Sequence, residues 1–282
     1  MPKLLVMDKS VFHGTSPERL IQFVGEYNVL LPNTLGIECI ISDEEDGKKP
    51  SKNPSRLLDK LCILIRNGAY SGRSMGSMIN RERESHKITD CIIDHENTKL
   101  IREGKINLDP SFIESEAEIA KEAFLPMIDF CKKMATTTYE SLVKKNLQKS
   151  FRQQCNQTDP ENRLKNWIQA ADKLRERILN DQLSLPSFYI TDRNDKWLNW
   201  QLLRIYFAWA MEWACRRNAS DSAMNNTDIS NDFYDMEYVV YLNNADGILS
   251  RDGNLVLPLS KAAFPEKDVF SCLDDVTEEY RC

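Results

Sequence analysis

The sequence predicts an α/β protein in which both ends of the chain contribute strands to one parallel sheet, interrupted by a large and mostly helical insertion. Three observations lead to this fold class. Strand-like and helix-like stretches alternate within the first 41 residues, the same alternation returns after residue 231, and helical periodicity dominates between them. With 282 residues, of which 41% are hydrophobic, the chain can bury a sizeable core.

The N-terminal end reads as strand, helix, strand, helix. Residues 3–8 form a short apolar run that predicts a buried strand. Ser16 followed by Pro17 is typical of a helix start, with Ser16 as N-cap, and this helix is expected to reach about residue 24. Residues 27–31 predict a second strand, and Pro32-Asn33-Thr34 leads into a helix that carries Glu38.

The middle of the chain reads differently. Residues 43–53 predict a charged surface loop, residues 56–66 a helix, and the Gly-, Ser- and Met-rich residues 68–80 an exposed loop. Cys91-Ile92-Ile93 could be a strand. Four helices follow, with Asp159-Pro160-Glu161 as a helix start, a break at Ser184-Leu185-Pro186 and a polar linker over 218–231; the helices are expected at 111–125, 127–151, 160–181 and 194–217.

The α/β pattern returns at the C-terminal end. The expected order is a helix over 232–243, a strand over 247–250, a helix over 255–263 and a strand over 268–271. The acidic tail 274–279 is expected to fray. We therefore predict an α/β core made of residues 1–41 and 232–282 and a helical insertion over 42–231.

Charge divides along the same boundaries. The net charge is −6, which argues against a protein that coats nucleic acid non-specifically, but residues 42–230 carry +2 and the two flanks carry −8. This division suggests a metal site in the flanks and polyanion contacts in the middle.

Other sequence features argue against disulfide-linked, zinc-binding, secreted and membrane-spanning proteins. The eight cysteines include no Cys-x-x-Cys pair, which predicts buried free thiols, and the three histidines offer no zinc spacing. The N-terminus is too short and too soon charged for a signal peptide, and the densest apolar stretch, 205–211, lies between Arg204 and Glu212. Together these features predict a cytoplasmic protein with no membrane span.

Four acidic residues carry the expected chemistry: Asp8, Glu38, Asp235 and Asp252. Asp8 and Asp252 each follow an apolar strand, while Glu38 and Asp235 lie on helices that would line the same edge of the sheet. Carboxylates gathered at one point repel each other unless a cation lies between them, and Mg²⁺ and Mn²⁺ prefer such oxygen ligands. The sequence therefore predicts a site for one or two divalent cations.

In these stretches the chain resembles a PIN domain. The similarity lies in Met7-Asp8-Lys9-Ser10, in Pro32-Asn33-Thr34-Leu35-Gly36-Ile37-Glu38, in Asp235 and in Ser250-Arg251-Asp252, and it covers roughly residues 3–41 and 232–272. The resemblance implies a Rossmann-like nuclease fold that cuts mostly single-stranded RNA with Mg²⁺ or Mn²⁺. It also implies supporting roles for Ser10 and Ser250. PIN domains are usually about half this length, and residues 42–230 have no counterpart in the pattern.

The third acid has rivals. Asp232 and Asp246 compete with Asp235, and Asp232 is kept as a further candidate metal ligand. Asp235 is preferred because its spacing to Asp252 leaves room for a helix, a turn and a strand. Asp232 could be only a helix N-cap, and Asp246 only a turn residue before Gly247.

Basic and aromatic residues of the middle supply candidate contacts to nucleic acid. Arg66, Tyr70 and Arg73 flank or lie in the Gly/Ser-rich loop, where a flexible backbone can follow a strand and a tyrosine can stack on a base. Lys144 and Lys145 belong to a second basic stretch, which a solvated helix face explains equally well.

We assign packing roles to two tryptophans and one histidine. Trp209 and Trp213, four residues apart on one expected helix, are assigned to the core. His13 lies five residues after Asp8 and could approach a phosphate, but a packing role is favoured.

Two other functions remain open at this stage. A haloacid-dehalogenase-like phosphohydrolase also begins with a strand that ends in Asp, but Ser10 stands where that class has a second Asp. From another class, a non-catalytic PIN-like scaffold could use the helical insertion to bind a protein partner or a second copy of the chain.

Overall fold

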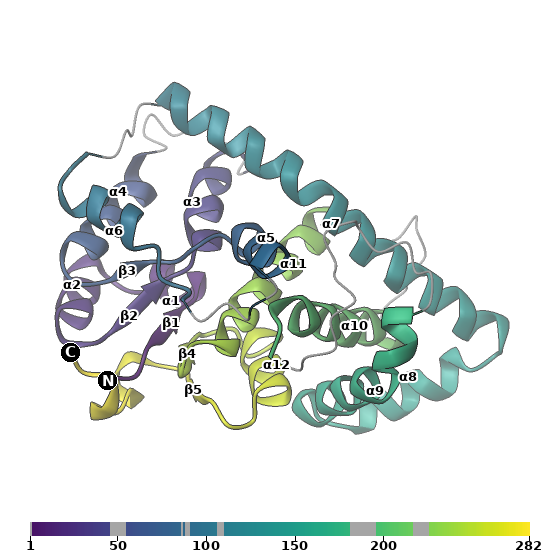
Figure 1. Cartoon of the computed structure of the whole chain (residues 1–282). Coiled ribbons are helices and arrows are strands. Elements are labelled where there is room, and N and C mark those ends of the chain that lie inside the picture. Colours follow the sequence, from purple (N-terminus) through teal and green to yellow (C-terminus); the bar gives the residue numbers. More distant parts are fainter. Residues whose placement is uncertain are drawn as a thin grey trace.

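The computed structural model describes residues 2–45, 55–85, 87, 91–105, 110–180, 196–216 and 226–282. Within them lies a five-stranded sheet with the order β3-β2-β1-β4-β5, in which all neighbours run parallel (Figure 1). The strands are β1 (Leu5–Met7), β2 (Val29–Leu31), β3 (Tyr70–Ser71), β4 (Gly247–Leu249) and β5 (Asp268–Phe270). The α/β fold built from both ends of the chain is thus confirmed.

Helices surround this sheet. They are α1 (Lys9–Gly14), α2 (Pro17–Glu26), α3 (Asn33–Glu45), α4 (Ser55–Arg66), α6 (His95–Arg102), α11 (Asn226–Val240) and α12 (Val256–Ala263). The expected helix start at Ser16 is confirmed, because its Oγ accepts a hydrogen bond from the Arg19 N–H at 3.4 Å. The loop expected over 43–53 begins inside α3, and most of it lies outside the described residues.

The expectation of an exposed loop over 68–80 is wrong. This stretch supplies the edge strand β3 and most of α5 (Met75–Ser85). Gly72 allows a close approach between backbones: its N–H donates to Leu31 O at 2.8 Å, and a Cβ there would lie 2.9 Å from Pro32 Cα. Ile93, in the stretch that could be a strand, forms an isolated antiparallel bridge with Gly72. The domain boundaries stay a prediction, although β3 lies within the range assigned to the insertion.

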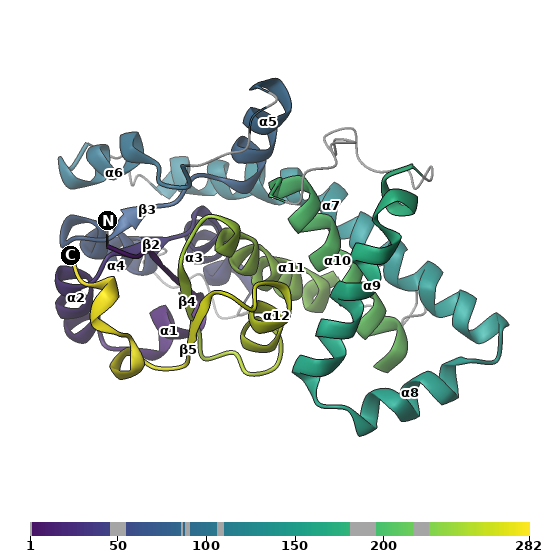
Figure 2. The same ribbon diagram turned by 60° about the horizontal axis from the view of Figure 1, so that its bottom comes forward.

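The large helical middle is confirmed. Its helices are α7 (Pro110–Lys144), α8 (Gln148–Gln157), α9 (Pro160–Asn180) and α10 (Leu198–Arg216), and α7 extends along one border of the molecule (Figures 1 and 2). The helix break expected at Pro126 is wrong, because α7 continues through this residue. Packing of α7 against α10, α3 and α11 outweighs the loss of one backbone hydrogen bond at the proline.

Two further boundaries differ from expectation. Helix α11 begins at Asn226, so the end of the expected polar linker is helical, while residues 217–225 and the expected break at 184–186 lie outside the described residues. The tail is not frayed, because it forms the 3-10 turns Leu273–Asp275 and Glu278–Tyr280. Tyr280 is fully buried, its carbonyl accepts from the Asn28 N–H at 2.7 Å, and its hydroxyl donates to Asp268 Oδ2 at 2.9 Å.

No helix in the described part of the chain is both long enough and apolar enough to cross a membrane.

Candidate functional site

The order of the strands marks one edge of the sheet as a place for a ligand. β1 and β4 are neighbours at the centre, and the chain continues from β1 toward β2 on one side and from β4 toward β5 on the other. In open α/β sheets, ligands usually bind at such a reversal, outside the carboxyl ends of the two strands. Asp8 follows β1 directly, and Ser250, Arg251 and Asp252 follow β4.

Asp8 is held by two serines. Its side chain is 1% exposed, and its Oδ2 accepts hydrogen bonds from Ser10 Oγ at 2.6 Å and from Ser250 Oγ at 2.5 Å. Burial raises the pKa of the Asp8 carboxyl, and these two hydrogen bonds oppose the rise because they stabilise its charged form. Ser10, in α1, and Ser250, directly after β4, thus both contact the same oxygen of Asp8.

Glu38 lies on α3 and also has two partners. Its Oε1 accepts from Lys9 Nζ at 3.0 Å, and its Oε2 accepts from Tyr238 OH at 2.6 Å. Burial raises the pKa of this carboxyl, while the positive charge of Lys9 lowers it. Lys9, between Asp8 and Ser10, thus supplies a positive charge inside the acidic cluster.

Asp235 lies on α11 and differs from the other acids. It accepts no hydrogen bond from the described residues, and its pKa is raised to about 9. Burial is the largest cause, and the remaining causes are the charges of Asp8, Glu38, Asp252 and Asp232. The charges of the other three expected acids therefore act on Asp235, while their role as cation ligands stays a prediction.

Asp252 has a structural task at the start of α12. Its Oδ1 accepts from the N–H groups of Asn254 at 2.8 Å and Leu255 at 3.3 Å, and its Oδ2 accepts from the Val256 N–H at 3.3 Å. These bonds satisfy donors that have no partner inside the helix. The carboxylate is thereby fixed next to Ser250, whose Oγ accepts from the Asp252 N–H at 3.0 Å.

The two rivals of Asp235 have other positions. Asp246 precedes β4, and its Oδ2 accepts from the Leu4 N–H at 2.8 Å, so it lies at the amino end of the sheet, away from Asp8. Asp232 Oδ2 accepts from the indole N–H groups of Trp209 at 2.8 Å and Trp213 at 2.6 Å. Asp232 therefore ties α11 to α10, although its charge still acts on Asp235.

Sequence reasoning missed three residues of this region. Glu237 is buried, accepts from Thr34 Oγ1 at 2.6 Å and has its pKa raised to about 7, chiefly by burial. Tyr238 and Lys9 were missed as partners of Glu38. The available signal was weak: Glu237 and Tyr238 follow Asp235 within one helical turn, in the run Asp-Met-Glu-Tyr.

Three of the residues expected to bind the substrate, Arg66, Tyr70 and Arg73, have partners among the described residues. Arg66 Nε donates to Ile101 O at 3.1 Å, Arg73 Nε donates to Ile93 O at 3.1 Å, and the Tyr70 ring lies 5.3 Å from the Arg102 guanidinium. These contacts join α4, β3 and α6. Lys144 and Lys145 are exposed at the end of α7. Among the residues described, none of these five contacts one of the four acids.

The donor set has the chemistry of a divalent-cation site, although the oxygen atoms do not form a finished cage. Carboxylate oxygens suit Mg²⁺ and Mn²⁺, and the pKa of Asp235 is raised first by burial and then by the charges of the neighbouring acids. Over the described ranges, no three His, Cys, Asp or Glu side chains converge closely enough to hold a metal ion. Asp8, Glu38 and Asp252 each accept hydrogen bonds from protein donors, which occupy part of their lone pairs.

Comparison of the chain with protein-family models, with curated proteins and with solved structures finds no match.

Proposed function

We propose that the protein is a metal-dependent nuclease that hydrolyses phosphodiester bonds, with single-stranded RNA as its substrate and Mg²⁺ or Mn²⁺ as its cofactor. The observation that carries the proposal is Asp235, a carboxyl with no described hydrogen-bond donor whose pKa is raised to about 9 by burial and by surrounding acids. The cluster lies at the carboxyl ends of the two central strands, where α/β proteins bind ligands. The choice of RNA rests on the resemblance of the motifs to PIN domains.

The residues of the cluster divide into ligands and supports. Asp8, Glu38, Asp235 and Asp252 would hold the cation, with Asp232 next to Asp235. When bound, Mg²⁺ or Mn²⁺ lowers the pKa of a water molecule and offsets charge on the attacked phosphate. Ser10 and Ser250 orient the carboxylate of Asp8 through their hydrogen bonds to its Oδ2. Lys9 limits repulsion between Glu38 and its acidic neighbours.

The substrate strand requires positive charge outside the cluster. Lys144 and Lys145 are exposed and stay candidates. Arg66 and Arg73 also stay candidates, because their hydrogen bonds to the protein use only Nε, and the two terminal nitrogens of each guanidinium can still donate to a phosphate. Tyr70 is half-buried and remains the candidate for stacking on a base.

The deciding experiment is a cleavage panel on single- and double-stranded RNA and DNA with Mn²⁺ and Mg²⁺. We expect Asp8→Asn to lower cleavage by more than about a hundredfold, because even partners of metal ligands contribute 10- to 100-fold. Asp246→Asn is the matched control: this acid lies at the amino end of the sheet, and asparagine keeps an acceptor for the Leu4 N–H. Equal cleavage by the wild type and Asp8→Asn overturns the proposal.

The other two functions predict different results. A phosphoryl group trapped on Asp8 supports the phosphohydrolase; against it, Ser10 donates a hydrogen bond to Asp8 and offers no second carboxyl at that position. An inert scaffold shows no cleavage and no thermal stabilisation by Mn²⁺, because only a ligand of the native state raises apparent stability.

A further inference from the structure

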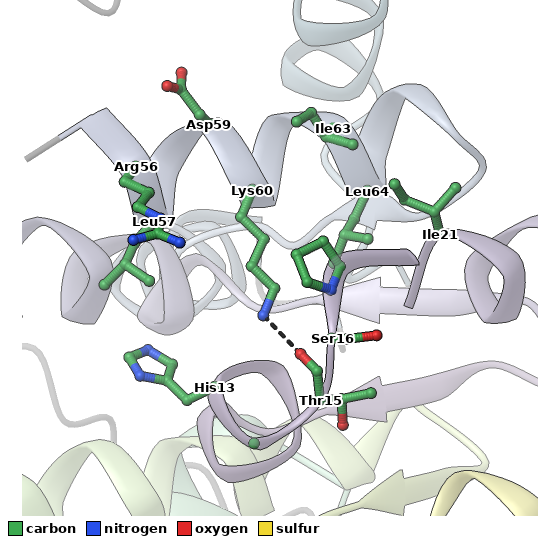
Figure 3. Close-up of a pocket in the computed structure, with 12 residues that line it drawn as sticks. His13, Thr15, Ser16, Ile21, Arg56, Leu57, Asp59, Lys60, Ile63 and Leu64 are labelled. Carbon is green, nitrogen blue, oxygen red and sulfur yellow. Dashed lines mark hydrogen bonds between the residues drawn. The ribbon is translucent and has the colours of Figure 1, made fainter. Parts of the chain in front are cut away.

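A cavity of about 800 Å³ lies between α4 and the segment that joins α1 to α2 (Figure 3). This volume is within the range of sites for small organic ligands. Its lining comes from two parts of the chain, residues 13–21 and residues 56–64. None of these residues belongs to the acidic cluster.

Three basic side chains line the cavity: His13, Arg56 and Lys60. Lys60 Nζ donates to the carbonyls of Phe12 and Thr15, the latter at 3.0 Å, which uses two of its three N–H donors. Arg56 is exposed and makes no hydrogen bond or ion pair with a described residue. Asp59 is the acidic residue of the lining, and its carboxylate points away from His13 and Lys60 (Figure 3). Arg56 and Lys60 therefore make this side of the cavity favour an anion. Burial and the charges of Lys9 and Lys60 lower the pKa of His13, which offers the anion a neutral ring N–H at pH 7.

Apolar side chains form much of the remaining wall, beside the hydroxyl residues Thr15 and Ser16. Leu57, Leu64 and Ile21 line the cavity together with Pro17. Leu64 is fully buried, while Leu57 and Ile21 are half-buried and keep accessible surface. A suitable ligand therefore combines a negative charge with a flat or apolar body.

Helix α1 and the side chain of Arg251 connect the cavity to the acidic cluster. Helix α1 runs from Lys9, directly after Asp8, to Gly14 on the cavity wall. Arg251, between Ser250 and Asp252, donates from Nη1 to Gly14 O at 2.6 Å and from Nη2 to Thr15 Oγ1 at 3.2 Å. One short helix and one arginine therefore separate the cavity from the proposed site of cleavage.

We propose that this cavity binds a nucleotide unit, with its phosphate facing Arg56, His13 and Lys60 and its base against Leu57 and Ile21. The ammonium of Lys60 also lies 4.6 Å from the centroid of the Phe12 ring, so Arg56 is the main contact to the phosphate. The inference rests on the proposed function in one respect: the bound nucleotide would belong to the RNA strand that the protein cuts. The cavity itself recognises one phosphate with one base, whether within a strand or as a free mononucleotide.

The test measures binding without cleavage, in EDTA. The probes are adenosine 5′-monophosphate, adenosine and inorganic phosphate by calorimetry, and a fluorescein-labelled ten-nucleotide RNA by anisotropy at several salt concentrations. Arg56→Gln is the test variant, and Arg152→Gln, an exposed arginine of α8, is the matched control. Leu57→Ala probes the apolar wall, and thermal melting shows that each variant is folded.

We expect Arg56→Gln to weaken binding of the monophosphate about tenfold, as for one lost hydrogen bond to a charged group. For the RNA, the slope of log affinity against log salt should become shallower by about 0.7, the value for one phosphate contact in a single strand. Leu57→Ala should weaken binding of the monophosphate and leave that of inorganic phosphate unchanged. Arg152→Gln should match the wild type.

Three results overturn the inference: no binding of the monophosphate, equal affinity in Arg56→Gln and Arg152→Gln, or equal affinity of the wild type for phosphate and for the monophosphate. Cleavage is measured in a separate assay with the metal ion present. Binding without cleavage would count against the nuclease and support the nucleotide cavity, whereas metal-dependent cleavage without binding in this assay would do the reverse.

Discussion

Asp235 combines burial with acidic neighbours, and this combination makes the stability of the protein depend on pH. Its pKa is about 9 in the folded protein and 3.8 without the fold. Between these values the folded chain holds a proton that the unfolded chain has released, so the free energy of unfolding falls as the pH rises from about 4 to about 9. Asp235→Asn should remove this loss and be more stable than the wild type at pH 7, by on the order of 2–4 kcal/mol.

Denaturant unfolding of both proteins from pH 5 to 9 measures this difference. Glu237→Gln is the control, because the pKa of Glu237 is raised only from 4.5 to about 7. Above pH 7 the control should therefore keep most of the wild-type slope, while Asp235→Asn should lose it. Parallel curves for the wild type and Asp235→Asn would show that the Asp235 carboxyl is not perturbed in this way.

At the scale of single residues, the sequence singled out the four acids and the two serines that bond Asp8, but not the partners of Glu38 and Asp232. Asp8 and Asp252 were predictable because strand ends are visible as apolar runs that stop at a charge. The two indoles on Asp232 were not, since Trp209 and Trp213 were readable only as apolar bulk. A hydrogen bond between helices depends on their relative rotation, which periodicity does not define.

Among the elements, α12 shows how one side chain can serve both a fold and a site. Asp252 accepts bonds from N–H groups at the start of this helix and also belongs to the acidic cluster. Asp252→Asn should keep the bonds that Oδ1 accepts from the Asn254 and Leu255 N–H groups, because its amide oxygen still accepts, and should still lose cleavage. Asp252→Ala should lose both, at a further cost of about 1 kcal/mol in the free energy of unfolding.

Chemical unfolding and the cleavage assay, run on the same preparations, separate the two roles. If Asp252→Asn cleaves at the wild-type rate, Asp252 is a helix cap and no cation ligand.

Elements were predictable where local signals and packing agree. The cap at Ser16 with Pro17 defined the start of α2 correctly. The helix break predicted at Pro126 was wrong, because packing along α7 overrides the local effect of the proline. The loop predicted at Tyr70–Ser71 was also wrong, because a strand of two residues is too short to show a periodicity. Such short edge strands are defined by the neighbouring strand, here β2, rather than by their own sequence.

For the molecule as a whole, the tail closes the sheet on its amino side. Tyr280 packs its ring against Phe270, with centroids 5.5 Å apart, and binds Asp268 through its hydroxyl. Tyr280→Ala should lower the free energy of unfolding by about 3–5 kcal/mol, as for other buried aromatic residues. Tyr280→Phe should cost only about 1 kcal/mol, the usual contribution of one hydrogen bond.

Thermal or denaturant unfolding of the two variants checks this ranking. Equal stability of Tyr280→Ala and the wild type would mean that the tail is frayed, as the sequence alone suggested.

The pairing of β1 with β4 also has a consequence for the time at which the protein can fold. Asp8 and Ser250, which meet at the ends of these strands, are 242 positions apart in the chain. At about 5–20 residues per second, a ribosome needs roughly 10–50 s to make that length. During this interval the inner edge of β1 has no partner strand, and an open edge is a template for pairing with other chains. The nascent chain is therefore most exposed to aggregation in the period between the synthesis of its first strand and its fourth.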